Sequence, residues 1–291
     1  MIDQIAIKTS NLGKRYRTFW ALEDCNITVP SGSVTALVGS NGAGKTTLLK
    51  LLVGLSASSS GNAVVLGNSR SKNADYLADI GYLAQEIPLY ESFNAREHIK
   101  MGEKLNQEWD SKLAASRLEE LDIPLDRPVG KLSGGQRAQV GLALALAKKP
   151  KLLLLDEPVA ALDPLARADF LSSLAQAVAE ANGELTVVMS SHLLSDLERI
   201  CDHIILLATG KTQLCESIEE AIDSHRLLTG KRRQLTGKEN FTVIKESQTE
   251  RETRLLVRVD GKVTDAHWHV SDVDIEEIIL AYMGQKKGVK K

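Results

Sequence analysis

The stretch that decides the fold is VTALVGSNGAGKTTLLKLL, residues 34–52. It opens with a continuous apolar run, typical of a strand buried on both faces of a sheet, and closes with a helical pattern. Between the two, residues 39–46 read GSNGAGKT and match the pattern G-x-x-x-x-G-K-[ST]. In such a loop the glycines let backbone amides turn towards phosphate oxygens, Lys45 supplies charge to the β- and γ-phosphates, and the Thr46 hydroxyl suits Mg²⁺. The stretch therefore predicts a phosphate-binding loop between a strand and a helix.

Length and composition set the outer bounds. The chain has 291 residues, of which 43% are hydrophobic and 25% charged, and its net charge is −2. At roughly 150 residues per domain, this favours one large or two modest domains. The charge gives no basic field for nucleic acid, and no run reaches the roughly 18 apolar residues of a membrane helix. We therefore expect a cytoplasmic protein that reaches a membrane only through a partner.

Strand and helix patterns alternate along most of the chain. Further continuous apolar runs at residues 151–156, 185–191 and 203–208 predict buried parallel strands, and residues 165–181 and 193–201 predict helices between them. The opening, residues 5–33, alternates with a period of two and predicts an antiparallel meander. Together these patterns predict an α/β fold with a mixed sheet core and an antiparallel β subdomain.

Two further segments differ in texture. Residues 86–131 contain amphipathic helical patterns on polar linkers and predict a helical subdomain. From residue 225 the chain becomes basic and turn-rich as far as residue 240, then shows strand patterns at 241–246 and 253–259 and a final helix at 274–284. We expect a cassette of residues 1–224 and a small C-terminal α+β accessory region of residues 225–291.

Candidate chemistry lies where two buried strands end. Asp156 and Glu157 follow the run at 151–155, and His192 follows the run at 185–191. Ligands of open α/β sheets bind at the carboxyl ends of strands. A carboxylate there can hold hydrated Mg²⁺, and its neighbour can polarise an attacking water. We assign Asp156 to the metal, Glu157 to the general base and His192 to the γ-phosphate and water.

A second anion site is predicted by LSGGQRAQV, residues 132–140. Ser133 is a candidate N-cap, and Gly134, Gly135 and Gln136 open an apolar helix. The bared amides of a helix N-terminus bind anions readily. The chain thus carries two phosphate-binding stretches, and sequence alone leaves open whether both serve one nucleotide.

Five stretches now stand in order: GSNGAGKTT, GYLAQEIP, LSGGQ, LLLLDEP and SSH. Over residues 1–220 this order resembles the nucleotide-binding subunits of ATP-binding cassette (ABC) transporters, whose fold is a P-loop NTPase cassette. The resemblance implies that Tyr16 stacks on adenine, with Phe19 and Trp20 as competitors for that role. It also implies that Gln85 senses Mg²⁺ and the γ-phosphate and that His192 is a switch residue. The ATP-binding residues that it implies are Tyr16, Gly39, Ser40, Asn41, Gly42, Ala43, Gly44, Lys45, Thr46, Thr47, Ser133, Gly134, Gly135, Gln136 and Asp163, with Thr46, Gln85 and Asp156 at the metal.

The resemblance also implies an assembly. Two cassettes would pack head to tail, as a homodimer or a heterodimer, with the LSGGQ stretch of each closing on the other's ATP and the Asp163 loop crossing between them. Mg²⁺-dependent ATP hydrolysis would drive a separate membrane permease from the cytoplasmic face of the cell membrane. Leu89, Tyr90 and Phe93 are candidates for docking that permease. One departure is Ala160, where the family often has serine, but Glu157 is present and predicts a working ATPase.

The alternatives differ in what the ATPase drives. The NGAGKTT loop, the compact insert and the C-terminal region resemble exporters of drugs, antibiotics or peptides, and importers are the second possibility. A soluble ABC ATPase acting on ribosomes or DNA is the third. It fits less well, because the chain has one cassette, no long heptads and no broad basic face. No residue names the transported substrate.

Overall fold

The computed structural model describes residues 5–69, 77–191, 200–232, 240–259, 261, 263 and 265–284. The chain divides into two compact units, Met1–Cys215 and Glu216–Lys291, which are described separately below. Among the described residues, no helix combines the length and the apolar character needed to cross a membrane.

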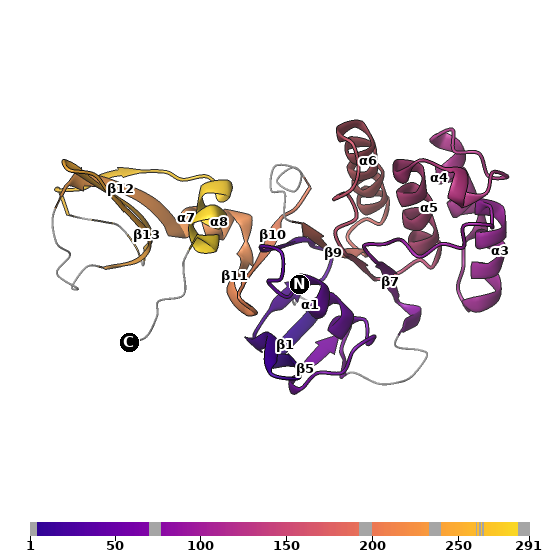
Figure 1. Cartoon of the computed structure of the whole chain (residues 1–291), viewed down its shortest axis with the longest axis horizontal. Coiled ribbons are helices and arrows are strands. Elements are labelled where there is room, and N and C mark those ends of the chain that lie inside the picture. Colours follow the sequence, from indigo (N-terminus) through magenta and orange to yellow (C-terminus); the bar gives the residue numbers. More distant parts are fainter. Residues whose placement is uncertain are drawn as a thin grey trace. The chain divides into compact units, whose positions relative to one another are not determined.

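A six-stranded sheet forms the centre of the first unit, in the order β11-β10-β4-β9-β8-β7 (Figure 1). Neighbouring strands from β10 to β7 pair in parallel. The continuous apolar runs are thus buried strands, as predicted, because both faces of this sheet are covered. The strands are β4 (Val34–Val38), β7 (Ile80–Leu83), β8 (Leu152–Leu155), β9 (Thr186–Ser191), β10 (His203–Ala208) and β11 (Lys211–Ser217).

The opening of the chain forms an antiparallel sheet, also as predicted. Strand β1 pairs with β2, β3 and β5, and β5 continues to β6. Two later strands therefore complete the expected meander. The bounds are β1 (Ile5–Tyr16), β2 (Phe19–Cys25), β3 (Thr28–Pro30), β5 (Ser60–Val65) and β6 (Asn68–Ser69).

Helix α1 (Lys45–Leu52) joins the two sheets through a common core. Leu48 and Leu49 are fully buried in one cluster with Leu37 of β4 and Leu22 of β2. Removing such apolar surface from water supplies about 1.5–3 kcal/mol for each large side chain. The helix that begins at the predicted phosphate loop is therefore fixed to the sheet by its apolar side.

The predicted helical subdomain contains α3 (Ala95–Leu105), α4 (Ser111–Glu120) and the short 3-10 helix η1 (Val129–Lys131), and it packs on α5 (Gly134–Ala147). The start of α3 is fixed by a reciprocal pair of bonds between Asn94 and Glu97. Ile99 of α3 and Leu118 of α4 share an apolar cluster with Val140 of α5. The helix that follows the LSGGQ stretch therefore belongs to the core of this subdomain.

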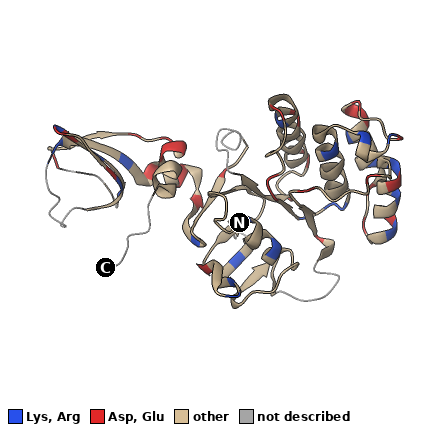
Figure 2. Cartoon of the chain, in the orientation of Figure 1, with Lys and Arg blue, Asp and Glu red and all other residues tan. Residues whose placement is uncertain are grey.

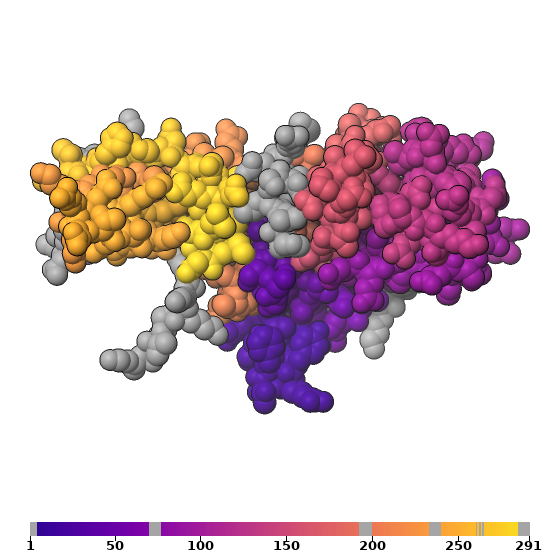
Figure 3. All heavy atoms as spheres, turned by 45° about the horizontal axis from the view of Figure 1, so that its top comes forward, coloured from indigo at the N-terminus to yellow at the C-terminus, as the bar shows by residue number. Residues whose placement is uncertain are grey.

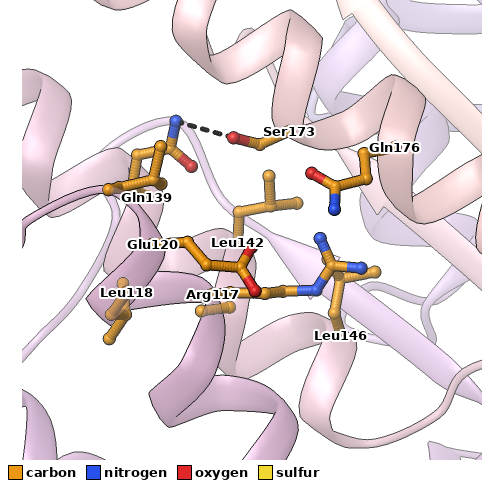
Figure 4. A pocket seen from close by; sticks show the side chains of 10 residues that line it. Arg117, Leu118, Glu120, Gln139, Leu142, Leu146, Ser173 and Gln176 are labelled. Carbon is orange, nitrogen blue, oxygen red and sulfur yellow. Dashed lines mark hydrogen bonds between the residues drawn. The ribbon is translucent and has the colours of Figure 1, made fainter.

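Polar side chains join α4 and α5 to α6 (Pro164–Glu180). Figure 4 shows Gln139 of α5 directed towards Ser173 of α6, and the Gln139 Nε2 donates to the Ser173 Oγ over 3.1 Å. Arg117 of α4 forms an ion pair with Glu180 of α6. Arg117, Gln139 and Ser173 border a cavity of about 30 Å³, which has room for one or two waters. In the space-filling view, residues of α6 lie directly beside the helical subdomain (Figure 3).

The second unit is a four-stranded sheet in the order β13-β14-β12-β15, with two helices. Residues 225–231 form strand β12 at the centre of the sheet, so the prediction of a turn-rich segment is wrong there: pairing with β14 and β15 overrides the local polar composition. The elements are α7 (Ile218–Ser224), β12 (His225–Lys231), β13 (Phe241–Gln248), β14 (Glu252–Val259), β15 (His269–Ser271) and α8 (Ile275–Met283).

A buried histidine explains why α7 belongs to the second unit, whereas the sequence placed the boundary after it. His225 is fully buried, its Nδ1 lies 2.7 Å from the carbonyl oxygen of Ala221 in α7, and its Nε2 lies 3.0 Å from the Tyr282 hydroxyl in α8. The carbonyl can only accept, so Nδ1 carries the proton and Nε2 accepts from Tyr282. Burial lowers the pKa of His225, which favours this neutral form.

Charge is mixed along the ribbon. Figure 2 shows Lys and Arg interspersed with Asp and Glu, including on helices α3 and α4. This mixture agrees with the net charge of −2 for the whole chain.

Candidate functional site

The phosphate loop lies between β4 and α1. Gly42 and Gly44 have φ values of +80° and +105°, in the left-handed region that glycine adopts at least cost. Gly44 is also the residue at which α1 is capped, and it offers no side chain to bond the first amides of the helix. No cap side chain therefore competes for those amides, which suits an anion-binding helix start.

Lys45 is the cation of this loop. It is only 5% exposed, and its Nζ donates to the carbonyl oxygens of Gly39 and Ser40 over 2.8 and 3.3 Å. The same Nζ lies 3.1 Å from Oε1 of Glu157. Because the side chain is buried and bonded to loop carbonyls and to a carboxylate, its ammonium group is fixed at the phosphate loop.

The acidic end of β8 meets the loop at the predicted place. Asp156 is 1% exposed, and the Thr46 Oγ1 donates to its Oδ1 over 3.0 Å. A hydroxyl and a carboxylate are hard oxygen ligands of the kind that Mg²⁺ takes, usually together with waters and substrate phosphates. The pair therefore fits a magnesium ion by its chemistry.

Ser190 is a residue that the sequence reasoning missed. It is fully buried on β9; its hydroxyl donates to Asp156 Oδ1 over 3.0 Å and accepts from the Glu157 backbone N–H over 2.8 Å. A signal was available: Leu155 pairs with Met189 in parallel, so the next residues, Asp156 and Ser190, are neighbours. The prediction used the SSH stretch only for His192, which lies outside the described residues.

A pocket of about 490 Å³ extends from the loop to the β1–β2 hairpin. It brings together Gln85, which follows β7, and Tyr16, at the end of β1. Phe19 also lines the pocket, whereas Trp20 is not among the lining residues. The Arg15 guanidinium lies over the Trp20 ring, with its Cζ 5.8 Å from the ring centroid. The lining residues are Tyr16, Phe19, Ala21, Asn41, Gly42, Gly44, Lys45, Thr46, Thr47, Gln85 and Glu157.

Tyr82 lies near the Asp156 carboxylate, and it carries no charge. Burial, together with the nearby Asp156 carboxylate, raises the pKa of Tyr82 on β7 to about 12. The phenol is therefore neutral at physiological pH and leaves the charge of the site to Lys45, Asp156 and Glu157.

The LSGGQ stretch lies at a different pocket. Ser133 caps α5, as predicted: its Oγ accepts from the Gln136 N–H over 3.2 Å, and the Gln136 Oε1 accepts from the Ser133 N–H over 3.1 Å. A pocket of about 180 Å³ opens beside this helix start and shares no lining residue with the pocket at Lys45. It is lined by Leu121, Ile123, Ser133, Gly135, Gln136, Gln139, Asp163, Leu165, Ala166 and Asp169.

Gly135 of the LSGGQ stretch packs against the first turn of α6, the helix that Asp163 caps. The Asp163 Oδ1 caps α6 by accepting from the N–H groups of Leu165 and Ala166 over 3.1 and 3.0 Å. A Cβ added at Gly135 would lie 2.6 Å from the Ala166 Cβ, so this approach of α5 to α6 requires glycine. The structure therefore separates the predicted site residues into two groups within one chain.

Known proteins resemble this arrangement. Residues 22–160 match the family model described as ABC transporter. The lantibiotic transport ATP-binding protein SrtF of Streptococcus pyogenes is 34% identical over 238 residues, which cover 78% of this chain and all of that protein. This chain belongs to the ABC transporter family. Its predicted family and its fold, a P-loop cassette of that family, are thus confirmed.

Two further similarities place the cassette within the family. The sulfate/thiosulfate import ATP-binding protein CysA of Synechococcus elongatus is 34% identical, and the match covers 76% of this chain but 65% of that protein's length. The solved structure of CbiO1 from Clostridium perfringens, part of the ABC transporter complex CbiONQ, is 26% identical with a TM-score of 0.65 and covers 76% of this chain and 91% of that one. ABC cassettes are ATPases that bind ATP with Mg²⁺, pair as dimers and work with membrane permeases.

Proposed function

We propose that this chain is the ATP-hydrolysing subunit of an ABC transporter. One observation carries the proposal. At the carboxyl ends of the parallel strands, Thr46 bonds Asp156 and Lys45 pairs with Glu157. Each of these residues belongs to a motif of the matched family. The pocket beside them, about 490 Å³, lies within the usual range for small-ligand sites.

The residues divide the work of phosphoryl transfer. The loop amides and Lys45 would hold the phosphates, Thr46, Asp156 and Gln85 would hold Mg²⁺, and Tyr16 would stack on adenine. A bound Mg²⁺ would neutralise charge on the phosphate oxygens. Glu157 takes a proton from water as the water oxygen bonds to the γ-phosphorus. The bond between the γ-phosphorus and the oxygen that leaves with ADP breaks in the same step. His192 completes the proposed site, with the loop residues Gly39, Ser40, Asn41, Gly42, Ala43, Gly44 and Thr47.

The second half of the catalytic site comes from another cassette in this proposal. Ser133, Gly134, Gly135 and Gln136 of one copy close on the ATP held by its partner, with Asp163 at the seam. Support comes from the two pockets, which share no residue within one chain. A two-fold pair turns two halves into two complete sites, whether the partner is a second copy or a related cassette.

An apolar groove supports a permease partner. It has a volume of about 550 Å³ and lies between the core and the helical subdomain, with Leu89, Met101 and Trp109 among its lining residues. Beside it, Tyr90 and Phe93 are 60% and 37% exposed, and their ring centroids are 5.3 Å apart. Exposed apolar surface of this kind suits a helix of a partner protein. Such docking would hold the chain at the cytoplasmic face of the cell membrane.

We place the transporter among exporters of drug, antibiotic or peptide type, with import as the alternative. The lantibiotic transport protein is matched along its whole length, whereas the sulfate import protein extends beyond the matched region. The unit Glu216–Lys291 would then serve as an accessory to the cassette, in dimerisation or in regulation.

One set of experiments tests the function. Glu157→Gln should bind ATP with Mg²⁺, lose hydrolysis and elute as a dimer in gel filtration. The general base is lost, while the phosphate loop of one copy and the LSGGQ stretch of the other still contact the ATP. A monomer at saturating ATP and Mg²⁺ would contradict the composite site. Purification of the tagged chain from membranes should recover an integral permease. ATPase stimulation by ribosomes or DNA, with none by that permease, would favour the soluble alternative.

A further inference from the structure

Ser190 occupies a buried junction between the two acidic residues of the proposed site. It lies near the carboxyl end of β9, which pairs in parallel with β8, and Asp156 follows the carboxyl end of β8. It is fully buried, so its hydroxyl must find partners within the protein. The partners that it has are Asp156 and Glu157.

The direction of both bonds is fixed by chemistry. The Glu157 backbone N–H can only donate, so the Ser190 Oγ accepts there, over 2.8 Å. The Ser190 O–H is then directed to Asp156 Oδ1, over 3.0 Å. Thr46 donates to the same Oδ1, also over 3.0 Å. Two hydroxyls on Oδ1 orient the carboxylate and leave Oδ2 to a cation.

The bond to Glu157 acts on a strained backbone. Glu157 has φ of +46°, in the left-handed region that non-glycine residues rarely adopt. Such a conformation persists only where its surroundings enforce it. Ser190 holds the N–H of this residue, and Lys45 holds its carboxylate at 3.1 Å. The orientation of Glu157 is therefore fixed both at its backbone and at its carboxylate.

We infer that Ser190 is a positioning residue that sets the metal-holding carboxylate and the general base relative to each other. The inference rests on the proposed ATPase function. Ser190 itself touches neither nucleotide nor water in this scheme. It acts by keeping Asp156 turned towards Mg²⁺ and Glu157 turned towards the γ-phosphate.

A matched control separates this role from packing. Thr35 on β4 of the same sheet is also fully buried, and its hydroxyl lies 3.2 Å from that of Ser33. Thr35→Val therefore removes a buried hydroxyl bond from this sheet without touching Asp156 or Glu157. If Ser190 only stabilised the sheet, Ser190→Ala and Thr35→Val would have similar effects on the nucleotide site.

The experiment compares Ser190→Ala, Thr35→Val and the unchanged full chain. Melting temperature checks folding, and fluorescent ADP is titrated with EDTA and with Mg²⁺. We expect Ser190→Ala to bind ADP normally in EDTA and to lose the affinity that Mg²⁺ adds. Loss of a hydrogen bond to a charged group predicts roughly tenfold more Mg²⁺ for half-maximal hydrolysis and a kcat lower by about tenfold. Thr35→Val should behave as the unchanged chain does.

The outcomes are distinct. Mg²⁺ dependence and kcat within about twofold of the unchanged chain would overturn the inference while leaving the ATPase intact. An equal loss in Thr35→Val would also overturn it. Failure of the unchanged chain to bind or hydrolyse ATP would instead overturn the proposed function. If Ser190→Ala does not fold, Ser190→Cys carries the test, since a thiol keeps the shape but bonds weakly.

Discussion

Two helices of the cassette begin at candidate phosphate sites, and they begin differently. Helix α1 starts after Gly44, which has no side chain to bond the first amides. Helix α5 starts after Ser133, whose hydroxyl and backbone are already bonded to Gln136. The first amides of α1 thus have no cap side chain, whereas the N–H of Gln136 in α5 is already bonded by the cap and the Gly134 and Gly135 amides remain for a ligand.

The charged residues around the two helix starts also differ. The pocket at α1 includes the cation Lys45, together with Glu157, among its lining residues. The pocket at α5 is lined by Asp163 and Asp169 and, among the described residues, by no lysine or arginine. A triphosphate carries several negative charges, so the α5 pocket would repel it alone and suits a phosphate already neutralised elsewhere. Under the proposed function, two phosphate stretches occur in one chain because one would hold the nucleotide and the other would complete a site in another copy.

The largest effect is expected at the α1 start. Lys45→Ala removes the buried ammonium that would pair with the triphosphate. Charge-assisted contacts of this kind predict a loss of about 10- to 100-fold in nucleotide affinity and a larger loss of hydrolysis. Fluorescent-nucleotide titration and phosphate release measure the two. Unchanged hydrolysis would show that the site is not at this loop.

The α5 start should respond in the opposite pattern. Ser133→Arg removes the cap and places a long side chain into the pocket of about 180 Å³. We expect nucleotide affinity at Lys45 to stay within about threefold, while hydrolysis falls at least about 100-fold because closure of the pair is blocked. Affinity and turnover are measured on the same preparation. If binding and hydrolysis both survived, the division into two half sites would be wrong.

Part of the fold and part of the site could be predicted from the sequence. The parallel strands were predictable because each is a continuous apolar run, and the phosphate loop because its glycines and Lys45 have a fixed spacing. Strand β12 was not, since its seven residues, His225–Lys231, are polar locally and become a strand only by pairing with β14. Ser190 was missed for a similar reason. Its role depends on a register between two strands separated in the chain, which the spacing of one motif does not contain.

The smallest effect isolates the hydroxyl of the α5 cap. Ser133→Ala removes one capping bond, worth about 1 kcal/mol of stability, and one candidate phosphate ligand. Ser217→Ala is the matched control, because Ser217 caps α7 by the same reciprocal pairing with Glu220 and lies in the other unit. Both variants should lose a similar amount of stability in urea unfolding, each in its own unit. We expect only Ser133→Ala to slow hydrolysis, by about 3- to 10-fold. Equal rates in the two variants would mean that Ser133 is a cap and nothing more, and that the glycine amides alone form the second half of the site.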